Sequence, residues 1–496
     1  MARGLTTALL LAIASIFLRL QFISFPIGDH PDEKIIARLA ERAVTTGTLT
    51  ANWEGFEEQF WWSRPTYQFS PYTLLENSLA IVSNRLSNWP ASWQDQVVFA
   101  RWFSVVVGGI AVFWCYLAAM AWFNDARIAL VAELFLAVAF LHVQDSCYAR
   151  VEALLSLAIL VAYWAAGLVM NRPALARCVL LGVSIGVAIA VKYNAAPVTL
   201  LSLAPFFAAR RDPTTDASFG GNPWRVALIG GGALVGFVMA TPEVLVSPEP
   251  LAEGIRFELN HYAEGHPPHQ AFDASDHNAK FWWNYLSRLG LGWAPTLATV
   301  GFALATVRLR GRHRLLAIAL AGALAVLLVV KVRFERNAEI LLGPLCLAAA
   351  AFVVWAWDMC STAGVRGLVR SAIVVGVLGN VVQHSLAFVD FHRQQLRSSS
   401  PLHMTRVSPQ EKNVMAQAVF DPPRRNWREY PAVLLYGFNE PFSRRGQTEW
   451  TERLKGWDLV VIEAPWVTAG YPFSTVEIYH GPGFVLAASR KPGDAP

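Results

Sequence analysis

The feature that most constrains this chain is a succession of apolar segments, each about long enough to cross a lipid bilayer. A transmembrane helix needs about 20 mostly apolar residues. We predict about eleven such segments, at roughly residues 5–25, 102–123, 128–141, 151–170, 176–191, 194–209, 224–247, 289–307, 314–331, 338–357 and 368–389. Charged residues make up 16% of the chain, against about a quarter in soluble proteins. The sequence therefore predicts a mainly α, polytopic transmembrane helical bundle.

Basic residues indicate how this bundle is oriented, because cytoplasmic loops carry an excess of lysine and arginine. With a cytoplasmic N-terminus every inner loop obeys this rule, through Arg3, Arg127, Arg172, Arg177, Arg210, Arg211, the four arginines at 308–314, Arg366 and Arg370. The acids and the long aromatic stretches then lie outside. The first segment has a basic start but no small-residue cleavage site after it, so we interpret it as a retained span.

The chain divides into a transmembrane unit at 1–390 and a polar tail at 391–496. Two outer loops, at 26–100 and 248–288, are too long to be mere connections, and such loops are usually functional or disordered. In the first loop we predict amphipathic helices at 32–47 and about 71–86. The tail has short strand-like runs between prolines and glycines, which predict a small extracytoplasmic α/β domain.

An acidic motif follows the first span. Asp29, His30, Asp32 and Glu33 lie within five positions, and Pro31 suits the first turn of a new helix. Asp32 and Glu33 then fall in that first turn, where the helix dipole favours negative charge. One interpretation is that these acids only start the helix. The other is that they carry chemistry at the membrane face.

Further ionisable residues come from distant parts of the sequence to the same predicted outer face. They are His142, Asp145, Arg150 and Glu152, then Lys192 with Tyr193, then Lys331, Arg333, Glu335, Arg336 and Glu339. An ionisable group at the edge of a span is a functional hypothesis, and the alternative for each base is a side chain that snorkels to the headgroups. Together the charges predict a site for an anionic, lipid-linked substrate.

Group transfer from a lipid phosphate fits this set of residues. An attacking hydroxyl needs a carboxylate to take its proton, and a departing phosphate needs positive charge. We therefore predict that Asp32 is the general base, with Glu33 beside it in the catalytic site. The predicted substrate-binding residues are His142, Arg150, Glu152, Lys192, Tyr193 and Arg336. Among them, Arg150, Lys192 and Arg336 bind the phosphate.

No cofactor is required by these patterns. Glu33 and Glu152 are the candidate ligands if a divalent metal ion binds, although their spacing does not demand one. Four histidines between 261 and 277 match no metal-binding spacing. The five cysteines are scattered and predict neither a metal site nor a disulfide framework.

Four stretches carry a resemblance to a known family. They are His30 to Glu33 (HPDE), Tyr148 to Leu154 (YARVEAL), Val191 to Asn194 (VKYN) and Arg333 to Pro344 (RFERNAEILLGP). In order and topology the chain resembles the GT-C superfamily of polytopic glycosyltransferases, on the branch of protein O-mannosyltransferases and the lipid A aminoarabinose transferase. In that branch the acid at the position of Asp32 is the proposed base. Glu152 stands where many relatives have aspartate, and Glu339 replaces an apolar residue.

The resemblance implies a polyprenyl phosphate-sugar donor, a reaction on the extracytoplasmic face and, often, a metal ion whose role varies between subfamilies. We predict a glycosyltransferase of a bacterial inner membrane that acts, with inversion, on a lipid, glycan or protein acceptor. The net charge of +5 does not indicate nucleic acid, because the basic residues cluster in short loops. The alternatives are a transporter or lipid-linked sugar flippase, and a non-catalytic scaffold subunit of a cell-envelope assembly.

Overall fold

A computed structural model describes residues 2–21, 23, 31–47, 73–86, 90, 93–208, 223–245, 248–264, 278–306, 311–331, 335–359, 363–398, 475–481 and 484–489. Each of the predicted apolar segments falls on a helix. The helices of the bundle are α1 (Ala2–Leu20), α4 (Trp93–Phe123), α5 (Ala126–Val138), α6 (Phe140–Ser146), α7 (Glu152–Asn171), α8 (Leu175–Val191), η1 (Tyr193–Phe207), α9 (Pro223–Ala240), α12 (Trp293–Ala305), α13 (Arg312–Val329), α14 (Glu339–Met359) and α15 (Ala363–Ser398). The mainly α transmembrane fold predicted from the sequence is confirmed.

Judged by length and composition, fewer helices qualify as membrane spans than the number of apolar segments predicted from the sequence. Within the described ranges, six helices are long and apolar enough to cross a membrane, or seven if the bent pair α5–α6 forms one span. Helices α1, α8 and α12 are apolar but shorter. The η1 segment is a 3-10 helix that contains Pro197 and Pro205, residues that interrupt regular α-helical bonding. The count of about eleven stays a prediction.

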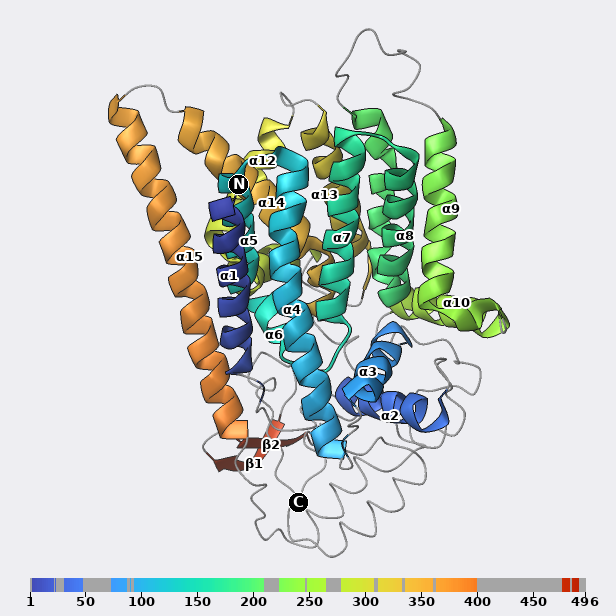
Figure 1. Cartoon of the computed structure of the whole chain (residues 1–496). Coiled ribbons are helices and arrows are strands. Elements are labelled where there is room, and N and C mark those ends of the chain that lie inside the picture. Colours follow the sequence, from blue (N-terminus) through green and yellow to red (C-terminus); the bar gives the residue numbers. More distant parts are fainter. Residues whose placement is uncertain are drawn as a thin grey trace, which may run out of the picture.

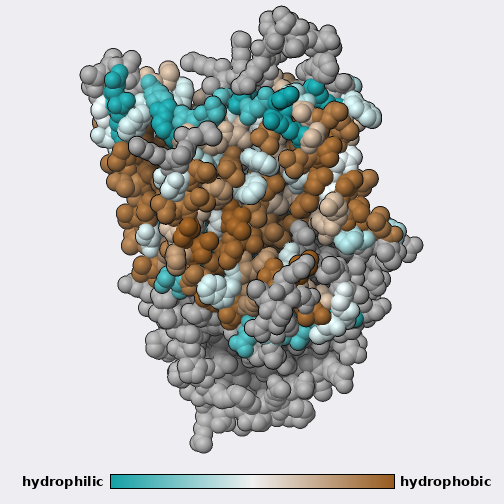
Figure 2. Space-filling model, viewed as in Figure 1, coloured by the Kyte–Doolittle hydropathy of each residue, from teal (hydrophilic) through white to brown (hydrophobic). Residues whose placement is uncertain are grey.

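The face of the bundle seen in Figure 2 carries a broad belt of apolar side chains, with hydrophilic residues at the rim next to the N-terminus. Several of the loops that we predict to be basic and cytoplasmic connect helices at this rim, among them the turn before Arg127 and the turn between α7 and α8 (Figure 1). The described side chains of helix α15 are mostly exposed, including Leu368, Val375 and Leu386. Such a surface suits lipid and gives the protein the character of an integral membrane protein.

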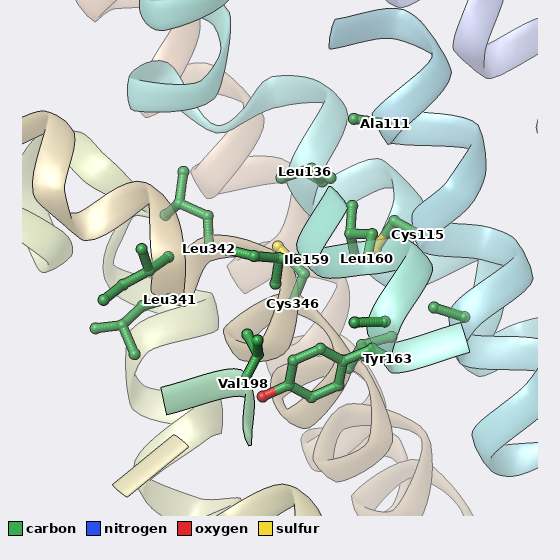
Figure 3. Close-up of a cluster of buried hydrophobic side chains, with 14 of the residues drawn as sticks. Ala111, Cys115, Leu136, Ile159, Leu160, Tyr163, Val198, Leu341, Leu342 and Cys346 are labelled. Carbon is green, nitrogen blue, oxygen red and sulfur yellow. The ribbon is translucent and has the colours of Figure 1, made fainter. Parts of the chain in front are cut away.

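Helix α7 lies at the centre and packs against α4, α8 and α14. Side chains from these helices and from α5, such as Leu136, Leu160 and Leu341, meet in a continuous buried cluster (Figure 3). Helices α8 and α9 approach closely through glycines: a Cβ added at Gly186 or Gly236 would meet the backbone of the other helix. Small residues allow this contact between membrane helices.

The end of the bundle away from the N-terminus carries extra helices (Figure 1). Helices α2 (Pro31–Thr46) and α3 (Thr73–Leu86) correspond to the two predicted amphipathic helices and pack on each other. Apolar side chains of α2 such as Ile36, Leu39 and Ala40 are buried. From the second long loop come α10 (Pro248–Glu264) and α11 (Asn278–Tyr285). The helices from the two loops that we predict to be extracytoplasmic therefore lie at this end of the bundle.

A π-helical turn, η5 (Leu286–Gly290), leads from α11 into α12. It leaves carbonyl groups outside regular helix bonding, and α15 supplies their partners. The Gln383 amide donates to the carbonyl oxygens of Ser287 and Arg288 at 3.1 and 2.6 Å, and His384 Nε2 lies 2.9 Å from the Leu291 oxygen. These bonds hold the turn where helix α6 also packs on it.

Of the predicted C-terminal domain, the structure describes the end of α15 and an antiparallel hairpin of β1 (Thr475–Gly481) and β2 (Phe484–Ser489). Helix α15 continues to Ser398, past the predicted boundary at residue 390. The rest of the tail lies outside the described residues, so a small α/β domain at 391–496 stays a prediction.

Candidate active site

The candidate site lies at the end of the bundle that carries α2, α3 and α10, where the chain enters helix α7 (Figure 1). Glu152 is the first residue of α7, and its side chain is only 3% exposed. A carboxylate with so little access to water must be paired or neutral. Its partners define the site.

Three cations from three parts of the sequence surround Glu152. Lys192 Nζ lies 3.0 Å from Oε1, Arg336 Nε lies 3.9 Å from the same oxygen, and Arg150 Nε lies 3.7 Å from Oε2. Lys192 and Arg336 keep 15% and 21% of their side-chain surface exposed. The carboxylate thus sits at the base of the cluster, whereas two of its cations remain reachable from outside.

The bend between α5 and α6 brings a second carboxylate to this cluster. Ala139 has an extended ψ of 118°, and the two helices turn by 60° there. Helix α6 therefore runs toward the loop before α7, where Asp145 forms an ion pair with Arg150. Burial lowers the pKa of Arg150, and the carboxylates of Asp145 and Glu152 raise it by more. Arg150 stays charged and joins the two acids.

Asn337 connects the cluster to the second outer loop. Its side-chain oxygen accepts hydrogen bonds from Lys192 Nζ at 3.3 Å and from the Tyr262 hydroxyl at 3.4 Å. The carbonyl of Tyr262 also accepts from the amide of Lys331 at 2.9 Å. Burial raises the pKa of Tyr262, so its hydroxyl remains a neutral donor. Helix α10 is thereby tied to the cluster at its C-terminal end.

Glu33 is placed differently from the other predicted site residues. Its carboxylate is fully buried and binds Arg101 of α4 through two bonds, Nε to Oε1 at 2.7 Å and Nη2 to Oε2 at 2.6 Å. Oε1 also accepts from the backbone amide of Ala149 at 2.9 Å. These contacts fasten the first turn of α2 to α4 and to the segment just before Arg150.

Tyr148 connects the Glu33–Arg101 ion pair to the cationic cluster. The guanidinium carbons of Arg101 and Arg150 lie 5.9 and 4.7 Å from the centroid of its ring, within the range of cation–π attraction. Asp32 directly precedes Glu33 in the first turn of α2, as predicted. Its side chain lies outside the described residues. The backbone of Asp32 is nevertheless held one residue from a contact with Ala149.

His142 takes part in a separate buried pair behind the cluster. Its Nδ1 lies 2.5 Å from Glu339 Oε1, and its Nε2 lies 3.3 Å from the carbonyl oxygen of Gly108. Both side chains are fully buried. Because a carbonyl only accepts, Nε2 must carry a proton. The pair then shares one further proton and is neutral overall, which suits its position inside the bundle.

Two further predictions concern a tyrosine and a metal. Tyr193 follows Lys192 as the first residue of η1, and its role in substrate binding stays a prediction. Within the described ranges no group of three histidine, cysteine or acidic residues is arranged to hold a metal ion. Glu33 is engaged by Arg101 and Ala149, and Glu152 is surrounded by cations, so neither fits a metal ligand there. The histidines at 266, 269 and 277 lie outside the described residues.

Sequence reasoning missed the groups that support the site. Arg101 precedes a predicted span, and a charge at that edge was the available signal. Asn337 stands between two noted residues, Arg336 and Glu339, but an amide gives no charge pattern. Tyr262 belongs to a loop in which only the histidines were singled out.

The fold and the site can be compared with known proteins. A family model described as dolichyl-phosphate-mannose-protein mannosyltransferase matches residues 94–239. No curated protein sequence matches the chain. The family-model match over part of the chain, together with the helical bundle, agrees with the resemblance to polytopic glycosyltransferases found in the sequence.

Among solved structures, the chain is similar to ArnT from Cupriavidus metallidurans. The form bound to undecaprenyl phosphate gives a TM-score of 0.55 at 13% identity, over 97% of both chains. The apo form gives 0.51 at 12% identity over the same shares. An Archaeoglobus fulgidus oligosaccharyltransferase tethered with an acceptor peptide gives 0.50 at 14% identity, over 79% of this chain. This chain spans 57% of that archaeal protein. These likenesses establish a shared fold.

Proposed function

We propose that this protein transfers a sugar from a polyprenyl phosphate carrier to an acceptor at the extracytoplasmic face of a bacterial inner membrane. The observation that carries the proposal is the meeting of Arg150, Lys192 and Arg336 around Glu152. Three cations face two carboxylates there, since Asp145 also pairs with Arg150. The cluster therefore keeps positive charge for an anion.

The carrier phosphate is the anion that suits this cluster. Lys192 and Arg336 are the partly exposed cations, so they contact the phosphate, and Arg150 stabilises it from behind. Positive charge placed where the leaving phosphate gains negative charge lowers the barrier. Glu152 positions the three cations around its carboxylate.

Asp32 serves as the general base in this scheme. It takes the proton of the acceptor hydroxyl or amine as that group attacks the anomeric carbon, and the bond to the carrier phosphate breaks. A single displacement of this kind inverts the configuration. Glu33 is a positioning residue, because its bonds to Arg101 and Ala149 fix the turn that carries Asp32.

A solved structure with the same fold also supports a polyprenyl donor. ArnT from Cupriavidus metallidurans has been solved with undecaprenyl phosphate, and this chain shares its fold. The acceptor is a lipid, glycan or protein. Membrane lipids complete the surroundings of the site, and no residue of the cluster calls for nucleic acid.

The proposal is tested on the purified protein in lipid nanodiscs. Undecaprenyl phosphate carrying a radiolabelled sugar is supplied with and without lipid A, peptide and glycan acceptors, and release of undecaprenyl phosphate is measured. We expect acceptor-dependent release with inverted product. Movement of the lipid-linked sugar across the bilayer without release of the carrier indicates a flippase instead. Binding and turnover that are both undetectable contradict the proposal.

A further inference from the structure

A second group of buried polar atoms lies beside the cationic cluster. Four of them have no hydrogen-bond partner among the described residues: the Tyr285 hydroxyl, Asp145 Oδ2, Glu152 Oε2 and Asn337 Nδ2. Asp145, Glu152 and Asn337 are each at most 2% exposed. A buried polar group without a partner costs about 1–3 kcal/mol. Native proteins rarely keep several together unless something binds there.

These atoms belong to one neighbourhood although they come from four elements. Tyr285 ends α11, and the following turn η5 packs on α6, which holds Asp145, and on η6 (Glu335–Ala338), which holds Asn337. Burial raises the pKa of the Tyr285 hydroxyl, and the nearby carboxylates of Glu335 and Asp145 raise it further. Arg150 joins Asp145 to Glu152, and Lys192 joins Glu152 to Asn337. The four atoms thus belong to elements that pack against one another around the cluster.

The position of Tyr285 is well fixed. Its ring stacks on Phe281 with centroids 6.4 Å apart and meets Trp282 edge-on at 6.4 Å. Trp282 donates to the Leu327 carbonyl at 2.9 Å, and Asn278 donates to the Leu328 carbonyl at 2.7 Å. Helix α11 is therefore fastened to the end of α13, and the hydroxyl is held rigidly at its place.

The chemistry of the four atoms excludes a second phosphate. Two are carboxylate oxygens, which only accept when ionised and repel an anion. The amide nitrogen donates, and the tyrosine hydroxyl can donate and accept. Such a mixture matches a group with several neighbouring hydroxyls, because each hydroxyl can donate to a carboxylate and accept from an amide or tyrosine.

We infer that Tyr285, Asp145 and Asn337 form a subsite for the hydroxyl groups of the donor sugar, next to the phosphate cluster. The inference rests on the proposed function and adds where the sugar ring lies. Tyr285 contacts the sugar and helps to set which sugar is accepted. Neither motif resemblance nor charge pattern points to this residue.

The test compares carriers with and without a sugar. Binding of undecaprenyl phosphate, and of undecaprenyl phosphate linked to mannose, glucose, galactose or arabinose, is measured for the full chain in nanodiscs. We expect at least one sugar-bearing carrier to bind the wild type about ten-fold tighter than the bare carrier. In Tyr285→Phe we expect that sugar-bearing carrier to bind about three- to ten-fold more weakly, as for one lost hydrogen bond, with the bare carrier within about two-fold.

A matched control removes a hydroxyl from the core instead. Tyr163→Phe lies in the buried cluster around α7 (Figure 3) and should leave both affinities unchanged. Thermal unfolding confirms that Tyr285→Phe, which keeps its ring, is folded. The inference is overturned if Tyr285→Phe loses the same affinity for the bare and for the sugar-bearing carrier. It is also overturned if the sugar increases affinity as much in Tyr285→Phe as in the wild type, or if no sugar increases the affinity of the wild type. Failure of the bare carrier to bind the wild type contradicts the proposed function instead.

Discussion

At the scale of single residues, Glu152 and its three cations make an unusual arrangement near a membrane. An isolated buried carboxylate is costly, and three cations without it would repel one another. The arrangement is stable because Asp145 and Glu152 offset Arg150 and part of the charge of Lys192 and Arg336. Among these five side chains one positive charge is in excess, and Lys192 and Arg336 stay partly accessible.

Asp32→Asn removes the proposed base with little change in volume. We expect turnover to fall by about 10²–10⁴-fold, the usual contribution of general acid–base catalysis, while carrier binding and thermal stability stay as in the wild type. Asp358→Asn, in an exposed ion pair with Arg127, is the control and should keep full turnover. Turnover of Asp32→Asn equal to that of the control would remove Asp32 from the mechanism.

Lys192→Met removes the cation nearest to Glu152, which lies 3.0 Å away. We expect affinity for undecaprenyl phosphate to fall about ten-fold, because a charge-assisted bond contributes about 1.5–3 kcal/mol. The salt dependence of binding should also weaken, since screening acts on one charge fewer. Isothermal titration at two salt concentrations measures both. The matched variant Arg177→Met, near the end of α7 opposite to Glu152, should bind normally.

At the scale of elements, the acid that follows Asp32 holds the site together rather than reacting. Glu33 joins α2 to α4 and to the segment before α7. Breaking one partner of a buried ion pair costs about 3–5 kcal/mol, and replacing both by apolar residues often costs much less. Glu33→Gln should therefore lower the melting temperature clearly. The double variant Glu33→Leu with Arg101→Leu should recover a large part of the decrease in melting temperature.

This prediction separates positioning from catalysis. In the double variant we expect Asp32 to be less well placed, so turnover should fall while stability is recovered. Differential scanning fluorimetry and the transferase assay give the two readouts. If Glu33→Gln melts like the wild type, the anchoring role of Glu33 is wrong.

The same scale explains what the sequence could and could not predict. Apolar segments and the amphipathic pattern after Pro31 predicted the helices, because both signals are local. The bend at Ala139 was hidden, since one non-glycine residue in extended conformation within an apolar run leaves no mark. The pairing of Glu33 with Arg101 was hidden too, because the partners lie 68 residues apart and depend on how α2 folds onto α4.

At the scale of the whole molecule, the charged cluster lies at the end of the bundle away from the N-terminus (Figure 1). The meeting of Arg150, Glu152, Lys192 and Arg336 was predictable from topology alone, because alternate loops share a face once the spans are counted. The contacts of Asn337 and Tyr262 were not predictable in this way, because uncharged side chains give no charge pattern along the sequence.

The orientation gives a test at this scale. Thr46 is exposed at the end of α2, and Arg172 is exposed at the opposite end of the bundle. We expect a cysteine in Thr46→Cys to react with a membrane-impermeant maleimide in intact bacterial spheroplasts. A cysteine in Arg172→Cys should react only after permeabilisation. The reverse pattern would place the cluster on the cytoplasmic side and contradict an extracytoplasmic reaction.

The most direct measurement is an electron cryomicroscopy structure of the protein with undecaprenyl phosphate in a nanodisc. The account predicts phosphate density within hydrogen-bond distance of Lys192 and Arg336, with the Asp32 carboxylate facing the same space. Density for the phosphate at another place, or an Asp32 side chain that points away from Lys192 and Arg336 into lipid or bulk solvent, would contradict it.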